Sequence, residues 1–186
     1  PWQVHWYDSL DSTNTQAKLM AREGAPHGTV LIAGHQTGGR GRMGRSFHSP
    51  AGAGIYMSIL LRPDCAPAEL MHLTCATGVA ASDAVFTACG IRPSIKWTTD
   101  LVLGKQKLGG ILTELSLNAD GWVNYAIVGI GINCRQEAGD FDPSILDMAC
   151  SARTIVGQDV DRNRLAAEKD IDCMTDLSNA GVFEGQ

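Results

Sequence analysis

The stretch Gly38-Gly39-Arg40-Gly41-Arg42-Met43-Gly44-Arg45 places four glycines and three arginines within eight residues. Glycine lets the backbone approach a ligand closely, and arginine offers a rigid fork of donors that suits phosphate or carboxylate. The apolar runs on either side, residues 29–33 and 55–61, are typical of buried strands. The sequence therefore predicts an anion-binding loop that connects two strands of a sheet.

The same loop contains Gly39-x-Gly41-x-x-Gly44, which matches the glycine spacing of the dinucleotide-binding fingerprint. That fingerprint also requires a helix at the third glycine and an acidic residue about 20 positions further on. Residues 45–50 end in Pro50 and are a poor helix start, and the next acid, Asp64, lies beyond the following predicted strand. We therefore favour an anion site over a Rossmann site. The three arginines also disfavour the plainer alternative, a solvated glycine-rich hairpin loop.

The composition narrows the class of protein and of ligand. A chain of 186 residues can bury one sizeable core, and 44% hydrophobic with 19% charged residues is ordinary for a globular domain. The net charge of -5 argues against a dedicated nucleic-acid binder, which is normally basic. Positive charge is instead local, so we expect a small anionic ligand. No apolar run is long enough to span a membrane, and no signal peptide is evident.

Six cysteines are spread along the chain without a C-x-x-C pair. A disulfide framework is not expected in a chain of this length with a normal core, and no Cys/His spacing predicts a metal site. We expect reduced, mostly buried thiols in a cytoplasmic protein. The cysteines are Cys65, Cys75, Cys89, Cys134, Cys150 and Cys173.

The rest of the chain predicts an α+β fold, with a mainly antiparallel or mixed β-sheet packed against a few helices, because most strands follow one another as hairpins. Glycines inside the last long strand, Gly129 and Gly131, indicate close approach of a ligand or of backbone. Capping residues 11–14 precede the first helix. We predict strands at 2–7, 29–33, 55–61, 94–97, 101–103, 107–117 and 122–134, and helices at 16–23, 66–89, 143–149 and 162–177.

Five motifs carry chemistry, and each is weak alone, because cap residues usually only cap and lysines are usually solvated. They are Asp11-Ser-Thr-Asn14, the loop 38–45, Lys96-Trp-Thr-Thr-Asp100, Lys107-Leu-Gly-Gly-Ile-Leu112 and Gly129-Ile-Gly-Ile-Asn133. Together and in this order they resemble the catalytic domain of the biotin protein ligases, of the biotin/lipoate ligase superfamily. The resemblance runs from about Tyr7 to Asn133.

The resemblance implies an ATP-dependent ligase with biotin and ATP as substrates and Mg²⁺ as the metal. Biotin and ATP would give biotinyl-5′-AMP, and the biotinyl group would pass to a lysine of a biotin carboxyl carrier domain. Two anions must meet in the first step, which a cluster of Arg and Lys can stabilise. The resemblance implies no nucleic-acid or membrane partner and allows a homodimer.

Site residues follow from the matched motifs. The catalytic positions implied are Arg40 and Arg42 near the carboxylate and phosphate, Lys107 between them, Lys96 at the departing phosphates, and Asp100 near Mg²⁺ and phosphate. The polar groups implied for the ureido ring of biotin are Ser12, Thr13 and Gln36, and Asn133 matches an adenine-reading asparagine. The other ligand-binding positions implied are Gly39, Arg40, Gly110, Leu112, Gly129 and Ile132. No residue is assigned as a dedicated metal ligand.

The sequence departs from the family at several points. Thr98 and Thr99 replace the usual Pro and Asn, Phe47 replaces a Trp, and Met43 stands where many relatives have Arg. We expect residues 1–186 to form the catalytic domain alone, without the N-terminal DNA-binding domain of repressing members or the small C-terminal β-barrel domain.

Other functions stay open at this point. A lipoate ligase or an octanoyltransferase of the same fold is disfavoured, because a lipoyl chain cannot use polar groups placed for a ureido ring. A catalytically weakened protein that only binds biotin is a further alternative, since Thr99 offers less hydrogen bonding than Asn. A glycine/arginine RNA-binding loop does not fit the net charge.

Overall fold

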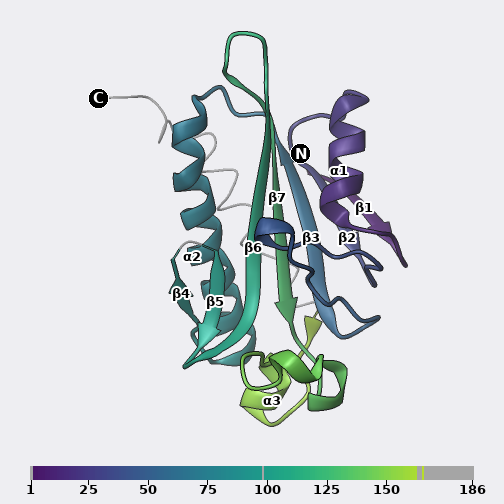
Figure 1. The fold of residues 1–186 in the computed structure, drawn as a ribbon, viewed down its shortest axis with the longest axis vertical. Helices are drawn as coiled ribbons and strands as arrows, with labels where there is room; N and C mark the ends of the chain where they lie inside the picture. The colour runs from purple at the N-terminus through teal and green to yellow at the C-terminus, as the bar shows by residue number, and fades with distance from the viewer. Residues whose placement is uncertain (1, 98, 163–164, 166–186) are drawn as a thin grey trace.

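The computed structural model describes residues 2–97, 99–162 and 165, and its described part is organised around one seven-stranded sheet (Figure 1). The strands are β1 (Gln3–Tyr7), β2 (Thr29–Ala33), β3 (Gly54–Leu61), β4 (Ser94–Lys96), β5 (Asp100–Leu103), β6 (Gln106–Leu117) and β7 (Val123–Asn133). The α-helices are α1 (Thr13–Arg22), α2 (Leu70–Cys89) and α3 (Ala152–Val156). Short 3-10 turns lie at η1 (Arg42–Gly44), η2 (Pro67–Glu69), η3 (Ala138–Asp140) and η4 (Pro143–Ile145).

The strand order is β1-β2-β3-β7-β6-β5-β4. Only β1 and β2 pair in parallel, because α1 lies between them in the chain and forms the crossover. All other neighbours pair antiparallel, and most are joined as hairpins. The predicted α+β class with a mixed, mainly antiparallel sheet is confirmed.

Helix α1 begins where a serine caps it. Ser12 has extended backbone angles, φ -159° and ψ 133°, and its side chain accepts a hydrogen bond from the Thr15 amide. The helix thus starts three residues before the predicted position, because the capping cluster itself forms the first turn. Its small residues Ala17 and Ala21 pack on Leu31 and on its neighbours in β3 and β7. This seam fixes the first turn of α1 over the centre of the sheet.

Helix α2 covers the other face. Its Thr74 hydroxyl lies 2.8 Å from that of Thr113, and Gly78 lies close to Ile111. On β6 these residues alternate with Glu114, which the first turns of α1 contact through Lys18. The two helices therefore lie on opposite faces of the sheet. Figure 1 shows α1 near the edge formed by β1 and α2 near the edge formed by β4. Because α2 lies on the other face, it does not cover the middle of β6 and β7 on the face that carries α1.

The segment after β7 differs from the prediction. Residues 143–149 form only η4 and a turn, so the helix predicted there was wrong. The reason is that residues 148–150 pair with β6: the Lys107 amide donates to Met148 O at 2.7 Å, and the Cys150 amide donates to Lys107 O at 2.9 Å. The sequence prediction also missed α3, which begins at the cap Ser151. The predicted helix at 162–177 lies outside the described residues except for Arg162 and Leu165.

Within the described ranges no helix combines the length and the apolar character needed to cross a membrane. The five cysteines described are free thiols, and Cys173 lies outside the described residues. Burial raises the pKa of Cys134 to about 12 and that of Cys150 to about 11, so both thiols are protonated at neutral pH.

Candidate active site

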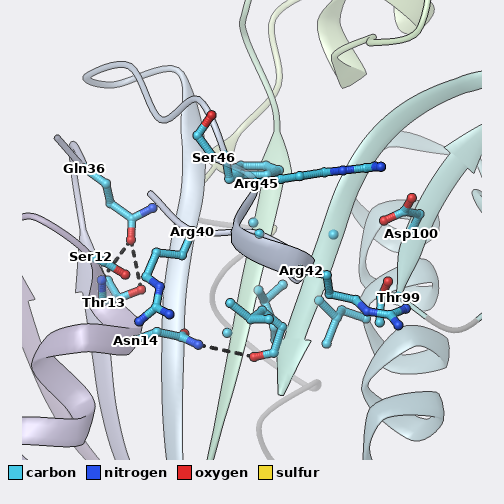
Figure 2. A pocket seen from close by; sticks show the side chains of 18 of the residues that line it. Ser12, Thr13, Asn14, Gln36, Arg40, Arg42, Arg45, Ser46, Thr99 and Asp100 are labelled. Atoms are coloured by element: carbon cyan, nitrogen blue, oxygen red, sulfur yellow. Dashed lines mark hydrogen bonds between the residues drawn. The ribbon is translucent and has the colours of Figure 1, made fainter. Parts of the chain in front are cut away.

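A cavity of about 240 Å³ lies between the arginine loop (residues 38–45), the start of α1 and β6 and β7 of the sheet. In Figure 1 the blue turn η1 crosses in front of these strands, and Figure 2 shows the cavity from close by. The residues that line it are Ser12, Thr13, Asn14, Gln36, Arg40, Gly41, Arg42, Met43, Arg45, Ser46, Phe47, Met57, Thr99, Asp100, Lys107, Gly110, Ile111, Leu112, Gly129, Ile130 and Gly131. Residues from all five motifs, which are far apart in sequence, therefore meet at one site.

Glycines form the floor of the cavity. Gly110 of β6 and Gly131 of β7 pair directly with each other. Gly129 lies two residues before Gly131 and therefore on the same face of the strand. A Cβ on Gly131 would lie 2.7 Å from the Phe47 ring, and one on Gly110 would lie 3.3 Å from the Lys107 ammonium. The missing side chains leave room for these groups to lie on the sheet, as expected where a ligand approaches a backbone closely.

Hydroxyl and amide groups gather at one end of the cavity, at the start of α1 (Figure 2). Gln36 Oε1 accepts from the Thr13 amide at 2.8 Å and from the Thr13 hydroxyl at 3.1 Å, and Gln36 Nε2 donates to Ser49 at 2.8 Å. Ser12, at 2% exposure, lies beside them. These side chains are fixed by one another and by the α1 cap, so this end can recognise a rigid polar group.

A carboxylate supports this polar end from β6. Glu114 accepts from Asn14 Nδ2 at 2.9 Å and contacts Lys18 Nζ at 2.5 Å and an Arg40 nitrogen at 3.3 Å. Burial acts to raise the pKa of Glu114, but hydrogen bonds from Lys18 and Asn14 and the two positive charges outweigh it and lower the pKa below the usual value. Glu114 is therefore ionised at neutral pH.

Cations gather at the opposite end. Figure 2 shows Arg42 beside Thr99, with Arg45 reaching toward Asp100. Lys107 Nζ lies 2.8 Å from Asp100 Oδ1, with 42% and 33% of the two side chains exposed. Exposed ion pairs contribute little to stability, about 0–1 kcal/mol, so an anionic ligand can replace Asp100 as the partner of Lys107. The lining holds four cationic side chains and one carboxylate, which favours a ligand with more than one negative charge.

The arginine loop is a strained, exposed arch. Met43 lies at its tip with 89% exposure and a positive φ of 56°, which is uncommon for a residue with a side chain. The arch closes on itself through the Gly41 amide, which donates to Arg45 O at 2.7 Å. Strain of this kind, of about 1–3 kcal/mol, is typical of segments that close on a ligand.

Most of the predicted site residues lie at this cavity. Those that line it are Ser12, Thr13, Gln36, Arg40, Arg42, Asp100, Lys107, Gly110, Leu112 and Gly129. The two arginines predicted to act together point to different ends: Arg40 lies beside Thr13 and Asn14, whereas Arg42 lies beside Thr99 (Figure 2). The roles of these residues stay predictions.

Four predicted residues do not line the cavity: Gly39, Lys96, Ile132 and Asn133. Lys96 is exposed on the edge strand β4, and Ile132 is buried in the core. Asn133 is engaged inside the protein, where its Nδ2 donates to Cys150 O and its Oδ1 accepts from Gln136. Gly39 lies under Phe47 and Ser49, where a Cβ would lie 2.6 Å from the Ser49 hydroxyl. The roles predicted for these four residues stay predictions.

The sequence prediction did not name Asn14, Phe47, Gly131 or Glu114 among the site residues, although Gly131 was interpreted as a point of close approach. Two of these carried a signal: Gly131 shares its strand face with Gly129, and Asn14 belongs to the capping cluster. Phe47 was noted only as a departure from the family's tryptophan. Glu114 carried no signal, because a single acid in a strand is usually a solvated side chain.

The chain is similar in sequence to a known family of proteins. Residues 6–133 match the model of the biotin/lipoate A/B protein ligase family. The chain is 40% identical to the bifunctional ligase/repressor BirA of Bacillus subtilis over 84% of this chain and 48% of that protein. It is 35% identical to the biotin–[acetyl-CoA-carboxylase] ligase of Mycobacterium tuberculosis over 84% of this chain and 57% of that protein.

Among solved structures, the biotin protein ligase of Aquifex aeolicus in complex with biotin and ATP superposes with a TM-score of 0.79. The two chains are 32% identical, and the match covers 95% of this chain and 72% of that one. The chain spans about half the length of the curated relatives it matches.

Proposed function

The chain belongs to the biotin/lipoate A/B protein ligase family, and from this premise we propose that it attaches biotin to a lysine of a carrier protein through biotinyl-5′-AMP. The observation that carries the proposal is the division of one cavity into two ends. One end presents hydroxyls and amides at α1, and the other presents Lys107 of β6 with Arg42 and Arg45 of the arginine loop. Biotin has the same division, with a neutral ureido ring and a carboxylate.

The polar end would select biotin over a lipoyl or octanoyl chain. Thr13 and Gln36 are held in place by two mutual hydrogen bonds, and Ser12 is buried next to them. A ureido ring offers N–H donors and a carbonyl acceptor to the hydrogen-bonding capacity that these groups keep, whereas a dithiolane ring or an alkyl chain would bury that capacity unused. Buried polar groups without partners lower affinity strongly, by about 1–3 kcal/mol each.

The cationic end would bring two anions together in the first step. An oxygen of the biotin carboxylate attacks the α-phosphorus of ATP, a new C–O–P linkage forms, and the bond to the β-phosphate breaks to release pyrophosphate. Lys107 and Arg42 would reduce the repulsion between carboxylate and phosphate and stabilise the charge of the transition state. The protein itself forms no covalent bond in this step.

In the second step, the amine of an acceptor lysine attacks the acyl carbon of biotinyl-5′-AMP. The amide bond forms as the C–O bond breaks, AMP leaves with the electron pair, and the nitrogen gives up one proton to solvent. The names of the relatives point to acetyl-CoA carboxylase as the source of the acceptor. We propose a biotin carboxyl carrier domain as the partner, cytoplasm as the compartment, and a homodimer as the assembly to be tested.

Magnesium would arrive with ATP. Mg²⁺ usually keeps several waters and is held by one or two carboxylates together with substrate phosphates. Among the described residues, Asp100 is the one carboxylate that lines the cavity, and no group of three or more His, Cys, Asp or Glu is placed to hold a metal. These residues fit a nucleotide-borne ion, which supplies charge neutralisation at the phosphates, and Asp100 would hold it.

The proposal is tested by calorimetry with biotin alone and then with ATP, followed by measurement of pyrophosphate release. We expect biotin to bind without ATP, and pyrophosphate to appear only when both are present. Binding without any pyrophosphate release would favour a protein that only binds biotin. Pyrophosphate release with lipoate or octanoate in place of biotin would favour the lipoate-ligase alternative.

The arginine loop is expected to become ordered when the cavity is filled. The arch is strained at Met43, and its three arginines line the cavity, so an anion that pairs with them should stabilise it. Amide exchange at residues 38–45 is therefore expected to slow by about tenfold or more with biotin and ATP. Amides of β3, which is buried along its whole length, serve as the internal control and should change little. Equal exchange in the loop with and without both ligands would contradict this.

A further inference from the structure

Glu114 stands behind the cavity instead of lining it, yet it contacts three side chains of the polar end. Its carboxylate receives Asn14 on one oxygen and Lys18 and Arg40 on the other. Only 18% of the side chain is exposed. A charge this well buried needs partners, and the partners are drawn from two separate elements, α1 and the arginine loop. Glu114 thus links the floor of the cavity to its two walls.

The contact with Asn14 fixes the direction of a chain of hydrogen bonds. Asn14 Nδ2 donates to Glu114 Oε2 at 2.9 Å and to Leu112 O at 3.3 Å, and both of these groups can only accept. The amide nitrogen must therefore point to β6. Asn14 Oδ1 is then left to face Ser58, whose hydroxyl donates to it at 2.6 Å.

The hydroxyl of Ser58 has one proton and also lies 2.7 Å from the hydroxyl of Thr13. Since Asn14 Oδ1 can only accept, it takes that proton. The proton of Thr13 then has Ser58 and Gln36 Oε1 as its acceptors, at 2.7 and 3.1 Å. Thr13 is left with lone pairs and no spare proton, so it accepts hydrogen bonds from whatever enters the polar end.

The contact with Arg40 has a second consequence. The guanidinium of Arg40 lies at the polar end beside Asn14, away from Arg42 and Lys107 (Figure 2). Glu114 shares its one negative charge between Arg40 and Lys18, which reduces the positive charge of the wall next to the hydroxyls. The larger group of cations that would attract a carboxylate, Arg42, Arg45 and Lys107, lies elsewhere in the lining.

We propose that Glu114 is a positioning residue for the biotin subsite, which orients Asn14 and, through Ser58 and Thr13, presents acceptors to ligand N–H groups. The inference rests on the proposed function, since it assigns the polar end to the ureido ring. Glu114 acts on the binding of biotin and not on the reacting atoms. Its loss therefore weakens biotin binding while the rate at saturation is kept.

The test uses Glu114→Gln, which keeps the shape and replaces one acceptor oxygen by an amide donor. The new amide nitrogen faces either Asn14 or the two cations: in the first case it opposes Asn14 Nδ2 and breaks the chain to Thr13, and in the second it leaves Lys18 and Arg40 without the carboxylate that holds them beside the subsite. We expect the dissociation constant for biotin, measured by calorimetry, to rise by about tenfold or more. The maximal rate of pyrophosphate release and the KM for ATP should stay within about threefold of wild type.

Asp83→Asn is the matched control, because it also turns a carboxylate into an amide: Asp83 lies on α2 and forms an exposed ion pair with Arg92. It should leave the biotin dissociation constant unchanged. Glu114→Asp is the second variant, to be used if Glu114→Gln fails to fold. It keeps the charge but shortens the reach to Asn14, so it should also weaken biotin binding. In an Asn14→Ala background, Glu114→Gln should change biotin affinity by less than about twofold, because the intermediary is gone.

An unchanged biotin affinity in a folded Glu114→Gln protein would overturn the inference. So would a full effect in the Asn14→Ala background, or an equal fall in maximal rate and in ATP affinity. These results are distinct from failure of the proposed function, because the wild-type protein is measured first. If wild type does not bind biotin, the proposed function fails and the inference fails with it.

Discussion

Lys107→Ala is expected to lower the rate of biotinyl-5′-AMP formation by about a hundredfold or more while biotin still binds. A fixed cation between a carboxylate and a phosphate stabilises charge that is greatest in the transition state, and removal of one such group costs roughly 3 kcal/mol. Lys107 is well placed for this, because its ammonium lies over Gly110 on the cavity floor and forms a partly exposed ion pair with Asp100. The polar end, where Thr13 and Gln36 lie, is untouched by the substitution.

The measurement is pyrophosphate release at saturating biotin and ATP, with calorimetry for biotin alone. Lys105→Ala is the matched control, since Lys105 is an exposed lysine in the turn between β5 and β6 and does not line the cavity. Its rate should equal that of wild type. The Lys107 variant should keep its thermal stability, because the lost pair with Asp100 is partly exposed. A near wild-type rate in this variant would show that another cation joins the two anions.

The elements of the sheet could be predicted because their signals are local. The strand at residues 29–33 has the predicted bounds, since an apolar run between turn residues has few other solutions. The helix at 143–149 was wrong for the opposite reason. Whether residues 148–150 coil or extend depends on Lys107, some forty positions away, whose backbone offers both a donor and an acceptor to them. A local sequence pattern does not predict backbone pairing between segments this far apart.

The candidate site shows the same limit. Gly129 could be singled out because glycine inside a strand has a short list of causes, and the cavity floor is one of them. Asn133 was matched by motif alone, and in the structure its amide is used by Cys150 and Gln136. Glu114 could not be found at all. Its importance comes from three contacts made across the fold, and no spacing along the chain encodes them.

Gly129→Ala is expected to raise the biotin dissociation constant by about a hundredfold, through the smallest possible addition to the cavity floor. The new Cβ would overlap the Asn14 side-chain oxygen and lie 2.9 Å from its Cγ. Asn14 cannot turn aside, because Ser58, Leu112 and Glu114 hold both ends of its amide. The first turn of α1 must move instead, and Thr13 moves with it.

Displacement of this turn by about 1 Å is enough for a loss of about a hundredfold, because the hydroxyls no longer meet the ligand donors. Overpacking should also lower the free energy of unfolding by about 1–3 kcal/mol. Gly139→Ala is the matched control: its Cβ would meet nothing within 4 Å, so both biotin affinity and stability should match wild type. Calorimetry and urea denaturation measure the two effects. If Gly129→Ala binds biotin as tightly as Gly139→Ala does, then Asn14 is free to yield, and the start of α1 is not the rigid wall of the biotin subsite.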